Sequence, residues 1–315
     1  MNFYGIVDGS EGSLKNFLSQ LPGVDQVGAE ARAAMLATRS IKTTSKRWAI
    51  DTAISMVDLT TLEGADTPGK VRALCTKAVR PDPTDLTIPS VGAVCVYNDM
   101  VSIARTHLDA IGGKHVPVAA VSTAFPSGRA SMEVKIQDTK DAIANGATEI
   151  DMVIDRGAFL AGKLGLVSDQ IRAIKEICGS QAHLKVILET GELVTLDNVR
   201  KASYLAMLAG ADFIKTSTGK VAPAATAPVV YVMLEAVRDF YKMTGLRIGV
   251  KPAGGIRNTK DAIKQLVLVN EIAGPEWLDP ALFRIGASAL LNDLLIQRMK
   301  MRDGYYASPN YVTLD

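Results

Sequence analysis

The sequence predicts an α/β fold: a closed (β/α)8 TIM barrel with an N-terminal helical extension. Eight short apolar runs have the composition of β-strands, and the starts of successive runs lie 25 to 37 residues apart. That interval accommodates a strand, a crossover helix and two loops. Runs that are apolar on both faces are typical of a parallel sheet covered by helices, and eight such units favour a closed barrel over an open doubly wound sheet.

Strands and helices alternate in order along the chain. Thr67 and Pro68 predict the start of the helix after the first strand, and Gly146 predicts the end of the helix before the fourth. Another helix is predicted from Thr195 to a stop at Gly210. The predicted strands are 54–60, 91–97, 116–123, 148–155, 184–190, 212–218, 247–254 and 281–288.

The pattern divides the chain into three parts. Residues 1–50 are expected to form an N-terminal helical extension packed on the barrel, with apolar-patterned helices near 13–21 and 29–37. Residues 51–303 hold the barrel, which is the catalytic domain if the chain is an enzyme. Residues 304–315 form a C-terminal tail with little to hold it down, which we expect to modulate turnover without belonging to the core.

Composition excludes several classes of partner. The 35 basic and 33 acidic residues are spread along the chain, no basic run occurs, and aromatic residues make up 5%, so nucleic acid is not expected as a partner. The longest uncharged stretch, 221–234, contains two prolines and falls short of the roughly 20 apolar residues of a spanning helix, so no membrane segment is predicted. A homo-oligomer is compatible with the sequence.

Cysteine usage indicates a reducing compartment. Cys75, Cys95 and Cys178 form no CxxC pair, and the N-terminus carries charges where a signal peptide would need an apolar segment. The sequence therefore predicts a cytoplasmic protein.

Two lysines and one aspartate stand in strands that otherwise read as buried. Lys215 lies in the last half of the sixth strand, Lys251 in the last half of the seventh, and Asp151 in the middle of the fourth. Chemistry in this fold sits at the C-terminal ends of the strands, so all three can point into one barrel mouth. A structural ion-pair cluster is one interpretation. The other is that two crowded ammonium groups lower the pKa of one amine, which then attacks a carbonyl and forms an imine.

Glycines at three strand ends indicate an anion site. The segments "STGK" at 217–220, "AGGIR" at 253–257 and "GAS" at 286–288 each place glycine where a strand ends. Glycine lets backbone N–H groups converge on an anion, and the loops after strands seven and eight are a recurrent phosphate site of this fold. The three segments together predict that a phosphate group binds there.

Five motifs resemble the deoxyribose-phosphate aldolase family: "DFIKTSTGK", "VKPAGGIR", "LKVILETGEL", "VDLTTL" and "FRIGASALL", with the resemblance covering roughly residues 56–295. These class I aldolases cleave 2-deoxyribose 5-phosphate to glyceraldehyde 3-phosphate and acetaldehyde. The resemblance implies Lys215 as the Schiff-base lysine, Asp151 as the proton-transfer carboxylate and Lys251 as the lysine that tunes Lys215. It also implies a sugar-phosphate substrate, no cofactor and no metal.

The same resemblance implies a set of residues around the substrate. One serine that many bacterial members have is replaced here by Ala289, so that one hydroxyl contact to phosphate is absent. The implied substrate-lining residues are Asp58, Thr60, Cys95 and Lys185, and the implied phosphate-loop residues are Thr218, Gly219, Lys220, Gly254, Gly255, Gly286 and Ser288.

Other interpretations of single motifs are weaker. "GADTPGKV" at 64–71 nearly fits a phosphate-binding loop, but Val71 replaces the hydroxyl residue, and a helix N-cap explains it better. The three histidines are scattered, which argues against a metal-dependent aldolase. Cys95 reads as a small buried hydrophobe rather than a nucleophile. Glu189 and Glu192 either orient the site or cap the following helix, and the cap is favoured slightly.

Two alternatives to this aldolase remain at the level of function. The first is a non-catalytic barrel that binds a sugar phosphate or a protein, although a binding module gains nothing from two crowded buried lysines. The second is a different Schiff-base aldolase or a transaldolase acting on a phosphorylated sugar.

Overall fold

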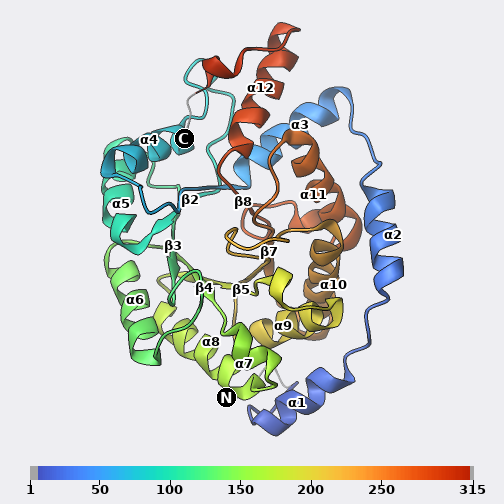
Figure 1. Cartoon of the computed structure of the whole chain (residues 1–315). Helices are drawn as coiled ribbons and strands as arrows, with labels where there is room; N and C mark the ends of the chain where they lie inside the picture. Colours follow the sequence, from blue (N-terminus) through green and yellow to red (C-terminus); the bar gives the residue numbers. More distant parts are fainter. Residues whose placement is uncertain (1–5, 313–315) are drawn as a thin grey trace.

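Eight parallel strands lie around a common axis in the computed structural model, which describes residues 6–312 (Figure 1). They are hydrogen-bonded in the order β7-β6-β5-β4-β3-β2-β1-β8. Their bounds are β1 Val57–Thr60, β2 Ala93–Tyr97, β3 Val118–Ser122, β4 Glu149–Val153, β5 His183–Ile187, β6 Phe213–Lys215, β7 Gly249–Lys251 and β8 Ile285–Ala287.

Strands β7 and β8 close the barrel. Two parallel bridges join their neighbourhoods, Val250 with Phe283 and Ala253 with Gly286. The backbone N–H of Gly286 donates to the carbonyl of Pro252 at 2.9 Å, in the register that those bridges set. No edge is left open between the two strands, and the predicted (β/α)8 barrel is confirmed.

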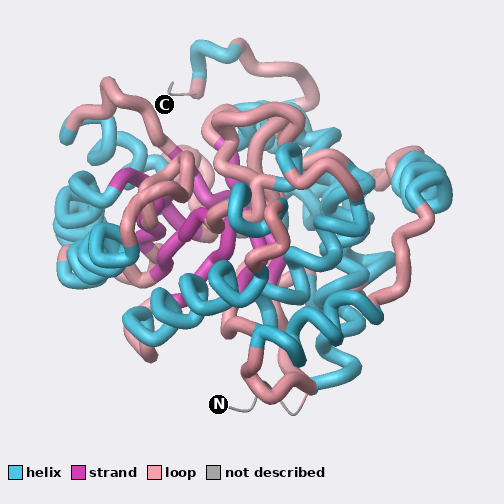
Figure 2. Tube along the Cα trace, turned by 60° about the horizontal axis from the view of Figure 1, so that its bottom comes forward, coloured by secondary structure: helices cyan, strands magenta, loops and turns pink. Residues whose placement is uncertain are grey.

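Helices surround the strands, as Figure 2 shows with the strands in magenta inside the cyan helices. The helix starts follow ordinary capping chemistry: the side chain of Thr67 accepts from the backbone of Lys70, and that of Thr195 from Asn198. The helices after the strands are α4 Pro68–Val79, α5 Val101–Ala110, α6 Met132–Ala144, α7 Arg156–Leu160, α8 Leu164–Cys178, α9 Leu196–Leu208, α10 Ala227–Thr244, α11 Thr259–Ile272 and α12 Leu290–Asp303. Short 3-10 turns are η1 Asn98–Met100, η2 Thr190–Glu192, η3 Pro275–Trp277 and η4 Pro309–Tyr311.

Three helices precede the barrel and pack on its outer layer. Helix α1, Glu11–Gln20, contacts α8 and α9; α2, Gln26–Leu36, contacts α10 and α11; and α3, Thr43–Ser55, contacts α11 and α12. Figure 1 shows α2 lying outside α10 and α11. Buried leucines and alanines, among them Leu18 and Ala33, hold these helices down.

The start of the first strand differs from the prediction. Ile54 belongs to the end of α3, and the strand begins only at Val57. Ala49, Ile50, Ala53 and Ile54 are all fully buried, and this spacing is that of one helix face. The sequence run from Ile54 resembles a strand because its residues are apolar and β-branched, although the helical period extends into it.

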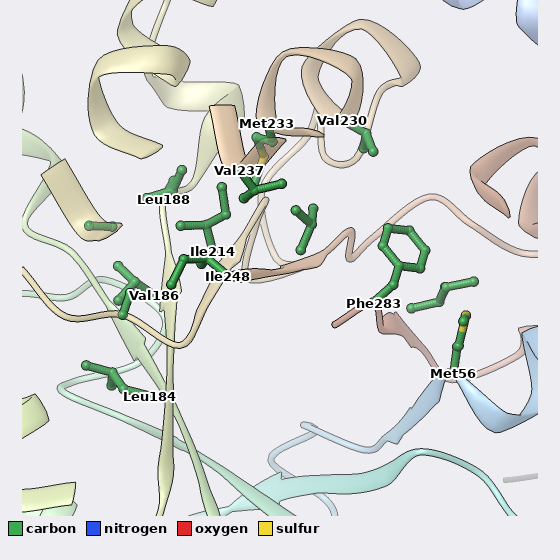
Figure 3. Packing of buried hydrophobic residues seen from close by; sticks show 14 of the residues in the cluster. Met56, Leu184, Val186, Leu188, Ile214, Val230, Met233, Val237, Ile248 and Phe283 are labelled. Atoms are coloured by element: carbon green, nitrogen blue, oxygen red, sulfur yellow. The ribbon is translucent and has the colours of Figure 1, made fainter. Parts of the chain in front are cut away.

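The main core lies between the strands and the helices. In β5 and the residue after it, Leu184, Val186 and Leu188 point outward at every second position and pack near Ile214 and Met233 (Figure 3). Among residues 6–312, no helix combines the length and the apolar character needed to span a bilayer.

Candidate active site

The predicted catalytic residues occupy the inward-facing positions of their strands. In β4, Ile150 and Met152 belong to the core between strands and helices, so the alternation of the strand turns Asp151 into the barrel. The same parity puts Lys185 inside β5 and Lys215 inside β6. The inner face of the barrel is therefore charged at this level, so these strands are apolar only on the face toward the helices.

Asp151 holds both predicted lysines through one oxygen atom. Its Oδ2 lies 2.7 Å from the Nζ of Lys215 and 2.8 Å from the Nζ of Lys251. The two lysines are paired across β6 and β7 at the last residue of each strand. Asp151 and Lys251 are fully buried, and Lys215 is 3% exposed. This geometry brings together the three residues that the sequence singled out.

More buried charges continue below these three residues. Asp58 forms ion pairs with Lys251 at 2.5 Å and with Arg284 at 2.7 Å. Arg284 also reaches Glu149 at 3.0 Å, and Glu149 pairs with Lys185, whose Nζ lies 3.4 Å from Asp151 Oδ1. We call this set the lysine cluster; its members are Asp58, Glu149, Asp151, Lys185, Lys215, Lys251 and Arg284.

The lysine cluster has one more cation than carboxylates. Three lysines and one arginine face two aspartates and one glutamate. A buried charge without a counter-charge is costly, so the cluster is neutral when one cation gives up a proton.

The pKa values of Lys215 and Lys251 move in opposite directions. Burial lowers the pKa of Lys215, and the nearby ammonium of Lys251 lowers it further, while Asp151 opposes both. Burial also acts to lower the pKa of Lys251, but the carboxylates of Asp151 and Asp58 outweigh it and raise that pKa well above its usual value. Of these two lysines, Lys215 is therefore the one that gives up a proton more readily, and a neutral amine is a nucleophile.

Asp151 stays ionised between the lysines. Burial would raise its pKa, but Lys215, Lys251 and Lys185 together hold that pKa well below the usual value. A carboxylate that contacts two amines can accept a proton from a group bound at Lys215 and return it.

A pocket of about 380 Å³ opens above Lys215 at the C-terminal end of the barrel. It is built from the loops after β1, β6, β7 and β8. The predicted residues that line it are Thr60, Lys215, Thr218, Gly219, Lys220, Gly254, Gly255, Gly286 and Ser288, with Ala289 beside them.

Glycine is required in these loops for two different reasons. Gly219, Gly254 and Gly255 have φ values of 81°, 82° and 86°, which other residues adopt only with strain. A Cβ at Gly286 would lie 2.9 Å from the Cβ of Ala253 and 3.2 Å from Cε of Lys251, so this glycine gives Lys251 its space. The open space around Gly255 leaves its backbone accessible from the pocket.

Cations surround the pocket, and two of them were missed by the sequence analysis. Lys220 pairs with Glu63 across the opening at 2.9 Å, and Lys70 pairs with Asp66 at 2.8 Å. Arg257 is exposed at the pocket and has no carboxylate partner within 6–312. A signal for both was present, because Arg257 ends the "AGGIR" segment and Lys70 lies in "GADTPGKV".

Glu189 holds the loop after β6 and caps no helix. Its carboxylate accepts from the hydroxyl of Thr218 at 2.5 Å and from the backbone N–H of Thr218 at 3.3 Å. Thr195 caps α9 instead, so the helix-cap interpretation of Glu189 was wrong. Burial raises the pKa of Glu189. The hydroxyl of Thr218 is thereby engaged with protein, while its neighbour Gly219 faces the pocket.

The remaining predicted residues lie inside the barrel. Cys95 is fully buried with Ala119 and Val121, and burial raises the pKa of its thiol, so it behaves as a small apolar side chain. The segment at 64–71 is a helix start, as the N-cap at Thr67 shows, and the helix-cap interpretation is confirmed.

Comparison with known proteins shows the family of this chain. The chain belongs to the DeoC/LacD family of aldolases, which matches residues 52–295. A deoxyribose-phosphate aldolase from Homo sapiens is 47% identical over 278 residues, covering 85% of this chain and 87% of the relative. One from Bos taurus is 47% identical over 264 residues, covering 81% and 82%. The resemblance to deoxyribose-phosphate aldolases that the five motifs predict is confirmed.

Solved structures share the fold. A deoxyribose phosphate aldolase from Aeropyrum pernix, described as a unique tetrameric structure, superimposes with a TM-score of 0.61 at 23% identity. The match covers 87% of this chain and 98% of that one.

Proposed function

We propose that this chain cleaves 2-deoxy-D-ribose 5-phosphate reversibly to D-glyceraldehyde 3-phosphate and acetaldehyde through an imine on Lys215. The observation that carries the proposal is the buried pair of lysines on one carboxylate oxygen, placed at the floor of a pocket lined by glycine loops and cations. The family membership and the two mammalian relatives support the substrate.

The reaction begins at the neutral amine of Lys215. Nζ adds to the C1 aldehyde of the open-chain sugar, and loss of water leaves an iminium. The iminium accepts the electron pair of the C2–C3 bond as Asp151 takes the proton from the C3 hydroxyl, which releases C3 to C5 as glyceraldehyde 3-phosphate. The enamine left on Lys215 takes up a proton and is hydrolysed to acetaldehyde, which restores the free amine.

Lys251 keeps its proton throughout. It lies 2.8 Å from the same oxygen of Asp151 that contacts Lys215, so it stabilises the carboxylate whenever Lys215 is neutral. Its raised pKa makes it a fixed positive charge next to the amine rather than a second nucleophile.

We assign the phosphate group to the side of the pocket that is formed by the loops after β6, β7 and β8. The loops that hold Gly219, Gly255 and Ser288 line this side, where backbone N–H groups would donate to the phosphate, and Lys220 and Arg257 add positive charge. Ala289 stands at the N-cap of α12, where it offers no hydroxyl. We also propose that the protein works in the cytoplasm, which its three buried, unpaired cysteines support.

A coupled assay tests this function. The purified chain should release glyceraldehyde 3-phosphate from deoxyribose 5-phosphate, and Lys215→Met should lower kcat/KM at least about a thousandfold because the nucleophile is gone. Lys114→Met, on the surface, is the matched control and should retain activity. Turnover of other phosphorylated sugars but not of this one would instead support a different Schiff-base aldolase, and no turnover of any would support a binding protein.

A further inference from the structure

The lower end of the lysine cluster lies far from the reacting amine along the barrel axis. Glu149 is the first residue of β4, and Arg284 stands one residue before β8. Both line a second pocket, of about 550 Å³, at the N-terminal end of the barrel. Neither residue lines the pocket that Lys215 enters, so neither can touch a substrate bound there.

These two residues are nonetheless joined to Lys215 by an unbroken chain of ion pairs. Arg284 contacts Asp58, which holds Lys251, and Lys251 shares an oxygen of Asp151 with Lys215. A second path runs from Glu149 through Lys185 to the other oxygen of Asp151. Because all these groups are buried, water screens the interactions among them weakly.

The titratable and charged groups around Lys215 come from most strands of the barrel. Strand β3 contributes alanines, valines and a serine, without a charge. The groups from the other strands are Asp58 of β1, Cys95 of β2, Glu149 and Asp151 of β4, Lys185 of β5, Lys251 of β7, and Arg284 before β8.

We propose that Arg284 and Glu149 are positioning residues that set the protonation state of the Lys215 amine from the opposite end of the barrel. Arg284 supplies the cation that leaves the lysine cluster with one positive charge in excess, and Glu149 prevents that excess from becoming two. Lys215 resolves the excess by releasing its proton. The proposal rests on the proposed function, in which Lys215 acts as a neutral amine.

The two residues are expected to act in opposite directions. With Arg284→Gln, three lysines face three carboxylates, and the cluster is neutral with Lys215 protonated, so the pKa of Lys215 rises. With Glu149→Gln the excess becomes two positive charges, and Lys185 turns to Asp151 alone, so the pKa of Lys215 falls. An ion pair that only stabilises the fold, without electrostatic coupling to Lys215, would leave the pKa of Lys215 unchanged when either partner is neutralised.

The experiment measures the Lys215 amine directly. Acetaldehyde and cyanoborohydride are applied over a range of pH, and the rate of labelling at Lys215 is followed by mass spectrometry. The midpoint is the pH at which the labelling rate of Lys215 reaches half its maximum. We expect this midpoint to move up by about 0.5 to 1 pH unit in Arg284→Gln and down by a similar amount in Glu149→Gln. The acid limb of kcat/KM should move with it, because deprotonated Lys215 is the reactive form.

Two further variants separate charge from structure. Arg284→Lys keeps the charge and should keep the midpoint even where its melting temperature falls. The double variant Glu149→Gln, Arg284→Gln restores the original excess of one positive charge, and its midpoint should return to within about 0.3 unit of the wild type. Because it leaves no unpaired carboxylate or guanidinium between these two positions, it also decides the question if a single variant does not fold.

The outcomes distinguish this inference from the proposed function. Midpoints that stay fixed, or that move in the same direction in both single variants, would overturn the inference while leaving the aldolase intact. A double variant whose midpoint differs by a full unit would also overturn it. Failure to label Lys215 in the wild-type protein at any pH would overturn both.

Discussion

Lys215 and Lys251 are the same residue type at paired positions on neighbouring strands, yet they have opposite electrostatic environments. Lys251 contacts two carboxylates, at 2.5 and 2.8 Å, whereas Lys215 contacts one, at 2.7 Å, and shares it. In the proposed function, this difference in carboxylate contacts keeps Lys251 a cation and makes Lys215 the amine. Sequence alone predicted that Lys251 lowers the pKa of Lys215; in the structure, burial has the largest effect on that pKa and Lys251 adds to it.

Replacing Lys251 with leucine should reveal its role. The variant leaves Lys215 as the only lysine on Oδ2 of Asp151, with Lys185 still at Oδ1, so the pKa of Lys215 rises and the acid limb of the pH–rate profile moves to higher pH. Turnover at neutral pH should fall by at least about two orders of magnitude, the scale of losing a group positioned for proton transfer. The measurement is kcat against pH, with Lys114→Leu as the surface control. A profile of unchanged shape and position in the Lys251 variant would refute this role.

At the scale of elements, strand parity and loop glycines build the site. Strands β6 and β7 are shorter than predicted and end at their lysines. Pro252 after β7 has no N–H to donate, and the backbone N–H of Ala253 donates to the side-chain hydroxyl of Thr216 at 2.9 Å. The chain can then turn into loops that line the pocket above the two lysines. The glycines in the sequence predicted these loops. They did not predict which loop atoms are hydrogen-bonded within the protein, such as the hydroxyl of Thr218, which donates to Glu189.

A bulky residue at Gly255 tests the phosphate side of the pocket. Gly255→Val places a side chain where the backbone would approach the anion, so kcat/KM should fall about tenfold to a hundredfold more for deoxyribose 5-phosphate than for deoxyribose. The measurement is the ratio of kcat/KM for the two substrates.

Gly245→Val is the matched control for this variant. Gly245 has φ 74° with open space around it, and it ends α10 outside the residues that line the pocket. It should carry similar backbone strain without changing the substrate ratio. Equal losses on both substrates in the Gly255 variant would mean that its loop does not hold the phosphate.

The whole molecule explains why some parts of the site could be predicted and others could not. The rule that chemistry lies at the C-terminal ends of barrel strands selected Lys215, Lys251 and Asp151 from their places in the predicted strands. Glu149 and Arg284 lie at the start of their strands, so the same rule directed attention away from them. Arg284 and Glu149 contact each other although they are 135 positions apart in the sequence, and a local sequence pattern cannot reveal such a pair.

Local sequence pattern also left features near the two ends of the chain unpredicted. Helix α3 was missed because its last residues have strand composition, and it crosses the predicted boundary at residue 50. In the tail, Val312 is buried against the core, and Lys300 lies 3.7 Å from the ring centroid of Tyr306. The effect of the tail on turnover stays a prediction, as does the division into three parts.

The most direct test of the account is to trap the covalent intermediate. The protein is incubated with deoxyribose 5-phosphate, reduced with borohydride, digested and analysed by mass spectrometry. We predict a stable added mass on the peptide that contains Lys215, and none on that peptide in Lys215→Met. A label on Lys251 or Lys185 instead, or turnover without any trapped lysine, would contradict the assignment of Lys215 as the amine that forms the imine.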